Sequence, residues 1–98
     1  MIKTDERGNL YILQDNSGYF TIKDLPSVTG RLEIVFDGDT RVEKKFEISG
    51  QKDVIVKLTR QDIESIGVGE HLWWADLIYG DEKDTIIYNK ICVLEREF

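Results

Sequence analysis

The sequence has few of the residues that mark disulfide-rich, collagen-like or metal-binding proteins. Its 98 residues include one cysteine, one proline and one histidine. A lone cysteine excludes an internal disulfide framework. With only one proline and eight glycines, the chain is neither collagen-like nor of low complexity. A histidine-based metal cluster or a Ser-His-Asp triad would depend on His71 alone. We therefore expect no metal and no cofactor.

The chain also lacks long apolar runs and clustered positive charge. No stretch approaches the ~18–20 apolar residues that cross a bilayer, and the N-terminal MIKTDERGN has no apolar core of a signal peptide. The net charge is −6, and Glu43 interrupts the only dense basic segment, at 41–45. Because phosphate binding needs a clustered positive field, we expect no nucleic acid and no membrane as partner. We expect synthesis in the bacterial cytoplasm.

The residues that are present suit one soluble globular domain. Hydrophobic residues make up 41% of the chain and charged residues 33%, which argues against disorder. The length predicts a single domain over residues 1–98. Residues 1–8 are charged and aperiodic, so we interpret them as a frayed lead-in.

Short segments of alternating apolar residues predict about seven β-strands. β-Branched and aromatic residues fit a pleated, half-buried surface, and turn signals recur at intervals of about 8–12 residues. The predicted fold is therefore an all-β, immunoglobulin-like antiparallel β-sandwich. The predicted strands span residues 9–14, 19–23, 31–36, 41–48, 54–58, 69–79 and 85–94.

The clearest hairpin joins the third and fourth predicted strands. Its loop contains Asp37-Gly38, a pair that readily adopts positive φ. The apolar face of the fourth strand is interrupted by Lys44. We expect this strand at a sheet edge, where an edge or inward-pointing lysine hinders pairing with other chains.

One short helix is predicted over residues 60–66. Thr59 and Asp62 have capping-box spacing, in which each side chain accepts a hydrogen bond from the other residue's amide. Leu58 and Ile63 have the spacing of a hydrophobic staple, and Gly67 is the expected left-handed stop. We expect this helix to bridge two strands across the end of the sandwich.

Strand 69–79 (GEHLWWADLIY) carries apolar residues on both faces. We assign its odd-numbered face, with Trp73 and Ala75, to the core, because the even-numbered face carries Asp76 and because alanine suits a crowded interior. An apolar face that remains exposed usually marks a contact site. The predicted interface anchors on that face are Leu72, Trp74 and Ile78.

Residues 57–95 resemble the second half of small β-sandwich domains in phage tail and baseplate proteins. The segment reads KLTRQDIESIGVGEHLWWADLIYGDEKDTIIYNKICVLE. The family is the N-terminal domain of phage baseplate upper proteins, with related prophage-encoded immunoglobulin-like proteins. His71 stands where an aromatic is usual, and the matching residues are Leu58, Thr59, Asp62, Gly69, Trp73, Asp76, Ile91 and Val93. The resemblance implies a virion or prophage structural protein whose partners are other tail proteins or further copies of itself.

Three functional interpretations follow. The leading one is a non-enzymatic structural or adaptor module of a phage or prophage tail or baseplate, located in the virion. The alternative is a carbohydrate- or peptide-binding β-sandwich module of a bacterial protein, with Tyr11, Tyr19 and Tyr88 as an aromatic row. The third, a small enzyme, lacks a catalytic constellation in the sequence.

The residues that could carry chemistry have simpler interpretations. We interpret His71 as a partly buried, hydrogen-bonded residue and Cys92 as a buried, inert thiol. The acidic loops 37–39 and 81–84 lack the spacing of a calcium-binding EF-hand. We interpret both loops as ordinary turns, with weak binding of a divalent cation as the alternative.

Overall fold

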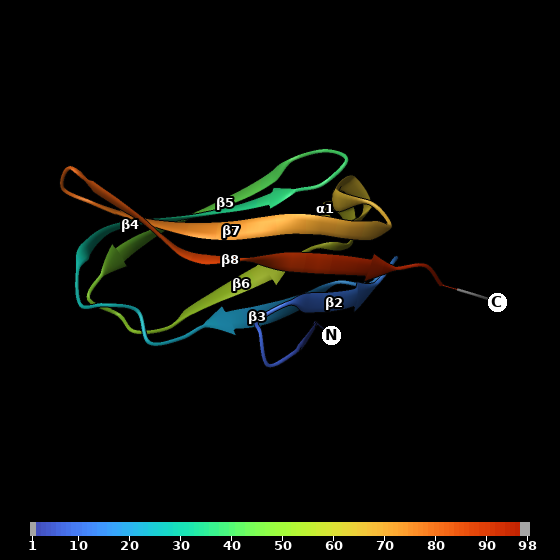
Figure 1. Ribbon diagram of the computed structural model, residues 1–98, viewed down its shortest axis with the longest axis horizontal. Helices are drawn as coiled ribbons and strands as arrows, with labels where there is room; N and C mark the ends of the chain where they lie inside the picture. Colours follow the sequence, from blue (N-terminus) through green and yellow to red (C-terminus); the bar gives the residue numbers. More distant parts are fainter. Residues whose placement is uncertain (1, 97–98) are drawn as a thin grey trace.

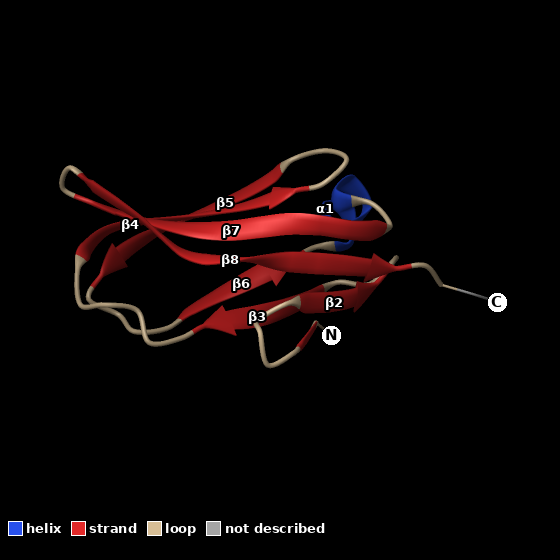
Figure 2. Ribbon diagram, in the orientation of Figure 1, coloured by secondary structure: helices blue, strands red, loops and turns tan. Residues whose placement is uncertain are grey.

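The alternating segments form strands and the capped segment forms a helix in a computed structural model that describes residues 2–96. The strands are β1 (Lys3–Thr4), β2 (Leu10–Leu13), β3 (Gly18–Ile22), β4 (Thr29–Asp37), β5 (Val42–Ser49), β6 (Val54–Leu58), β7 (Gly69–Tyr79) and β8 (Glu82–Leu94). The helix, α1, spans Arg60–Ile66 and lies at one end of the molecule (Figure 2). The predicted all-β fold with one short helix is confirmed.

The strands form two sheets that face each other (Figure 1). One sheet has six strands in the order β1-β2-β8-β7-β4-β5, and the other is the pair β3-β6. The run β8-β7-β4-β5 follows the G-F-C-C′ order of a variable-type immunoglobulin sheet, and β3-β6 corresponds to its B-E pair. Helix α1 carries the chain from β6 in the small sheet to β7 in the large one, as its predicted bridging role requires.

The structure differs from the predicted sandwich in two details. The described residues form eight strands where about seven were predicted, because β1 pairs with β2 at a sheet edge. The sandwich is also not purely antiparallel, since β2 runs parallel to β8. Parallel strands need a long connection between them, and here most of the chain separates the two. Local alternation predicts a strand but not the neighbour with which it pairs.

The predicted frayed lead-in is wrong for residues 2–8; Met1 lies outside the described residues. Ile2 is buried, and one carboxylate organises the turn that follows β1. That carboxylate, of Asp5, accepts hydrogen bonds of 2.9–3.0 Å from the amides of Arg7 and Asn9, the side-chain amide of Asn9 and the hydroxyl of Tyr11. Backbone amides of the turn are therefore hydrogen-bonded within the turn itself. The turn holds this part of the chain against the sheet.

Three aromatic rings join the two sheets at the centre of the core. Phe20 from β3 packs edge-on against Trp73 from β7 with 5.2 Å between ring centroids, and Phe36 from β4 stacks on Trp73 at 5.8 Å. Immunoglobulin domains place a B–F disulfide and a strand C tryptophan in corresponding strands. The chain replaces that covalent link with aromatic packing, which is consistent with its single cysteine.

The two faces of β7 differ sharply in burial, as predicted. The side chains of Trp73, Ala75 and Leu77 are at most 2% exposed, whereas that of Leu72 is 38% exposed. The assignment of the odd-numbered face to the core is confirmed. One premise of that assignment does not hold, because Asp76 on the other face is itself buried.

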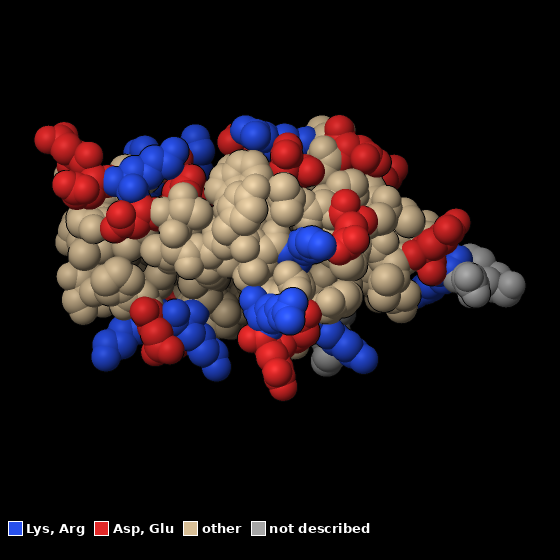
Figure 3. Space-filling model, in the orientation of Figure 1, with Lys and Arg blue, Asp and Glu red and all other residues tan. Residues whose placement is uncertain are grey.

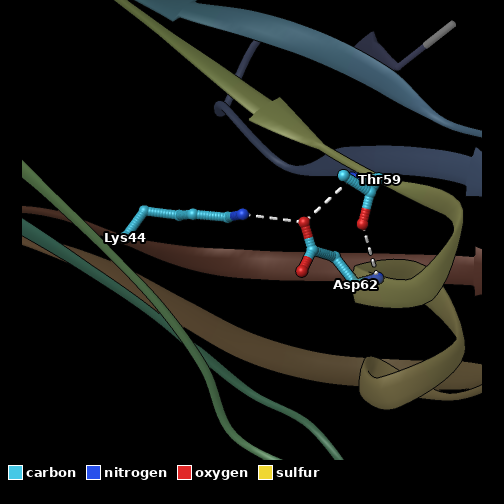
Figure 4. Close-up of polar contacts among 3 residues, drawn as sticks. All are labelled: Lys44, Thr59 and Asp62. Carbon is cyan, nitrogen blue, oxygen red and sulfur yellow. Dashed lines mark hydrogen bonds and ion pairs between the residues drawn. The ribbon is translucent and has the colours of Figure 1, made fainter.

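The capping box of α1 has the predicted geometry (Figure 4). The Thr59 hydroxyl accepts from the Asp62 amide at 3.0 Å, and the Asp62 carboxylate accepts from the Thr59 amide at 2.8 Å. Lys44 extends from β5 and donates to the same carboxylate at 2.8 Å. β5 is an edge strand, as expected, and its inward lysine joins that edge to the helix.

The two glycines expected in left-handed conformations behave differently from the prediction. Gly67 has positive φ, 86°, but its ψ of 157° lies outside the left-handed helical region. Gly38 has no positive φ; an added Cβ there would collide with the backbone of Ile66. The β4–β5 loop needs this close approach because its amides at Asp39 and Thr40 donate to the last carbonyls of α1, both at 2.9 Å.

Candidate interaction surface

The side of the six-stranded sheet that faces away from β3 and β6 carries an apolar patch. Strand register places Val35 of β4 and Tyr88 of β8 on either side of Trp74 in β7. We call this side the outer face. Its aromatic patch is formed by side chains that are exposed or half-buried, namely Leu72, Trp74 and Tyr88.

The centre of the patch is a stacked pair of rings. Trp74 and Tyr88 lie 5.9 Å apart between centroids with an interplanar angle of 17°. The guanidinium of Arg41 lies 5.6 Å from the centre of the Trp74 ring, a distance typical of a cation–π contact. These neighbours hold the indole in place, while Tyr88 remains 61% exposed.

A β-bulge shapes the patch beside these rings. The register of β7 with β8 shifts between Ala75 and Asp76, so that Ile86 is the extra residue. Thr85 then donates its hydroxyl to the Asp76 carboxylate at 2.6 Å, and Lys83 lies 3.7 Å from the other oxygen. These two contacts compensate the buried Asp76 carboxylate, and the extra residue Ile86 is 37% exposed.

The predicted anchors are only partly brought together. Leu72 and Trp74 lie in the patch, and the structure adds Tyr88 from β8. Ile78 lies on the same outer face but is separated from Trp74 by Asp76 and stands opposite Lys83. Alternation within β7 could identify its own face, but only the β7–β8 register reveals the contribution of β8.

Four ion pairs surround the patch on the same face. They are Arg31–Glu33 (2.8 Å), Arg41–Asp37 (3.9 Å), Lys83–Asp76 (3.7 Å) and Lys90–Glu70 (3.2 Å). Figure 3 shows this face, with uncharged side chains over the middle of β7 and β8, a blue and a red side chain over the right-hand part of these strands, and many charged side chains along the margins. The outer face is therefore close to neutral, although the whole chain carries −6.

A shallow depression of about 360 Å³ adjoins the patch. Tyr11, Tyr88 and Leu72 supply its apolar surface, and the turn held by Asp5 supplies part of its rim. The remaining lining residues are Arg7, Asn9, Glu70, Asn89, Lys90 and Cys92. Sequence reasoning missed the contribution of the turn because residues 1–8 have no apolar periodicity.

The aromatic row suggested by the sequence divides between the two sheets. Tyr11 and Tyr88 meet at the depression, but Tyr19 is on β3 in the other sheet. The Asp5 carboxylate accepts a hydrogen bond from the Tyr11 hydroxyl, and this bond raises the pKa of the phenol. The same hydrogen bond holds the Tyr11 ring in place beside the depression.

The surroundings of His71 and Cys92 give neither side chain a reactive role. The half-buried His71 places Nε2 2.9 Å from the Gly67 carbonyl oxygen, which confirms the prediction of a hydrogen-bonded residue. Cys92 is half-buried rather than buried. Burial raises the pKa of its thiol, and nearby Glu70 raises it further. A thiol with a raised pKa contains little of the nucleophilic thiolate at neutral pH.

The acidic loops are engaged in local contacts. Asp37 pairs with Arg41, and Asp84 accepts a hydrogen bond from the Tyr79 hydroxyl at 2.7 Å. Within residues 2–96, no group of three histidine, cysteine or acidic side chains is placed to hold a metal ion. Over the same residues, no helix has the length and apolar character to span a membrane.

No protein-family model matches the sequence, and no curated protein is significantly similar to it. The geometry of the outer face is therefore the basis on which a function can be argued.

Proposed function

We propose that this chain is a non-enzymatic structural or adaptor module that works by protein–protein contact through its outer face. The observation that carries the proposal is the aromatic patch, in which apolar side chains from two strands meet and remain exposed. Exposed contiguous apolar surface with a polar margin is typical of contact sites. Aromatic side chains at the centre of such a surface often supply most of the binding energy.

The proposed assembly is a tail or baseplate of a phage or prophage. This part of the proposal rests on the resemblance of residues 57–95 to baseplate domains. A virion component has to make durable contacts and needs no turnover. The contact geometry suits that role, because the rings of Trp74 and Tyr88 are already held against each other before a partner arrives.

The test is co-expression with the products of the genes that flank its own, followed by purification. We expect a flanking tail or virion protein to copurify with the wild-type chain and to be lost with Trp74→Ala. Tyr19→Ala is the matched control, because Tyr19 is an aromatic residue that is 64% exposed on the other sheet. A partner that is retained by Trp74→Ala and lost with Tyr19→Ala would contradict the proposed surface.

The depression favours one second candidate, a saccharide-binding module. Aromatic rings beside polar and charged side chains can stack on a sugar and hydrogen-bond its hydroxyls, and the volume of about 360 Å³ lies in the range of ligand pockets. A glycan array probed with the purified chain tests this candidate. Binding by a monomer that is lost with Tyr88→Ala and Tyr11→Ala would favour it over the contact module.

A further inference from the structure

We propose that the partner of the outer face is a second copy of this chain, related to the first by a two-fold axis that runs parallel to β7. This inference rests on the proposed contact function and adds the identity of the partner. Size, charge and shape each support it.

The outer face is large enough for a stable dimer. The molecule measures 48 × 23 × 21 Å, and Figure 1 views its broad side, across which the strands of the large sheet lie next to one another. The two longer dimensions, 48 × 23 Å, give a projected area of about 1,100 Å². A standard interface needs about 800 Å² from each partner, so most of this face would be used.

The charge of the face suits a second copy of a chain that carries −6. Like net charges oppose association, so self-contact is favoured where the surface is neutral. The outer face meets this condition because its ion pairs neutralise one another within the chain. Its centre is aromatic, and the nearby charge of Arg41 is already paired with Asp37 of the same chain.

The shape of the face is complementary to itself about the proposed axis. In a two-fold contact, the same surface serves both subunits. An axis parallel to β7 would place β8 of one copy over β4 of the other. Tyr88, which projects on the β8 side, would then lie over Val35, which is only 8% exposed on the β4 side. A projecting ring in each copy thus stands opposite a residue that is nearly buried in its partner.

The same axis pairs opposite charges at one end of the patch. Lys90 of β8 and Asp37 of β4 both stand beside Leu72, on opposite sides of β7. The two-fold rotation therefore brings Lys90 of one copy to Asp37 of the other, twice in the dimer. At the far end it brings Lys83 near Arg31, and all four of these residues also pair with an opposite charge of their own chain.

Sedimentation velocity from low micromolar to several hundred micromolar tests the proposal. We expect a concentration-dependent dimer of the wild-type chain. Trp74→Ala and Tyr88→Ala should each raise the dissociation constant at least about tenfold, as expected for a central aromatic anchor. Tyr19→Ala, on the opposite side of the molecule, should leave the constant unchanged. Circular dichroism of each variant checks that the fold is retained.

A charge exchange tests the orientation of the axis. Lys90→Glu and Asp37→Lys should each weaken the dimer, because each sets like charges together across the axis. The double variant should recover dimerisation, and so should an equimolar mixture of the two single variants. Failure of both to recover would overturn the proposed axis.

The same experiments separate this inference from the proposed function. A chain that stays monomeric at every concentration overturns the dimer, but the contact function survives if a flanking-gene product still binds in a Trp74-dependent way. A dimer that is unaffected by Trp74→Ala and Tyr88→Ala also overturns the inference. Loss of Trp74-dependent binding to every tested partner, including itself, contradicts both.

Discussion

Two neighbouring tryptophans on β7 belong to two different environments. Trp73 is 2% exposed between Phe20 and Phe36 in the core. Trp74 lies on the outer face, stacked on Tyr88 and contacted by Arg41. Since strand side chains alternate between faces, one step along the chain changes the role of the same residue type. The comparison separates what stabilises the fold from what is available to a partner.

Loss of the core tryptophan should have the largest effect on stability. Trp73→Ala removes the ring that joins the two sheets and leaves a cavity, so we expect a loss of ~3–5 kcal/mol in the free energy of unfolding, measured by urea denaturation. Trp73→Phe should cost less, because it keeps a ring beside Phe36. It also removes an indole N–H that has no hydrogen-bond partner among the described residues. A phenylalanine variant as unstable as the alanine variant would contradict this account of the cluster.

Loss of the helix cap should destabilise the end of the same core by ~1–2 kcal/mol. Asp62→Ala removes both the acceptor of the Thr59 amide and the partner of Lys44. Lys44→Met is the matched control, because it keeps the capping box and the aliphatic stem while it removes only the ion pair. Thermal unfolding should rank Asp62→Ala below Lys44→Met. Equal losses in the two variants would mean that the ion pair, and not the cap, holds this end of the sandwich, because Asp62→Ala also removes that pair.

Acid should weaken the same contact. Burial raises the pKa of Asp62, but the hydrogen bonds from Lys44 and from the Thr59 amide outweigh it and hold the pKa below its ordinary value of 3.8. A carboxyl group with a lowered folded-state pKa adds stability that is complete above its unfolded pKa and disappears as pH falls through the folded value. Below pH 3.8, the free energy of unfolding measured by urea denaturation should therefore fall more for the wild type than for Asp62→Asn. Parallel acid profiles would contradict the lowered pKa.

A smaller effect is expected where β7 begins. Immunoglobulin domains carry a tyrosine two residues before the F-strand cysteine, and its hydroxyl bonds to the backbone upstream. His71 occupies the corresponding position relative to Trp73 and bonds to the Gly67 carbonyl. His71→Ala should cost about 0.5–1.5 kcal/mol in unfolding free energy, and His71→Tyr should recover part of it. An equal loss of unfolding free energy in both variants would contradict the analogy with the tyrosine corner.

Local features of this fold were predictable from the sequence. Alternation identified the inward face of β7, and the spacing of Thr59 and Asp62 identified the helix with its capping box. These signals are local because the residues that create them lie within one strand or one helical turn. The edge position of β5 was also predictable, since Lys44 interrupts its apolar face.

Long-range contacts were not predictable in the same way. The parallel pairing of β2 with β8 and the ion pair from Lys44 to Asp62 depend on where distant segments meet. At the outer face, the sequence indicated Leu72 and Trp74, but Tyr88 joins them only through the β7–β8 register. The turn at Asp5 was missed because its order comes from hydrogen bonds to one carboxylate rather than from apolar burial.

The most direct test of the contrast between the two faces is the free energy of unfolding of Trp73→Ala and Trp74→Ala, measured by urea denaturation at a concentration where the chain is monomeric. We expect Trp73→Ala to lose ~3–5 kcal/mol. Trp74→Ala should lose less than ~1 kcal/mol, the scale of a cross-strand pair on an exposed sheet face. Equal losses, or a larger loss in Trp74→Ala, would contradict the assignment of Trp73 to the core and of Trp74 to the contact surface.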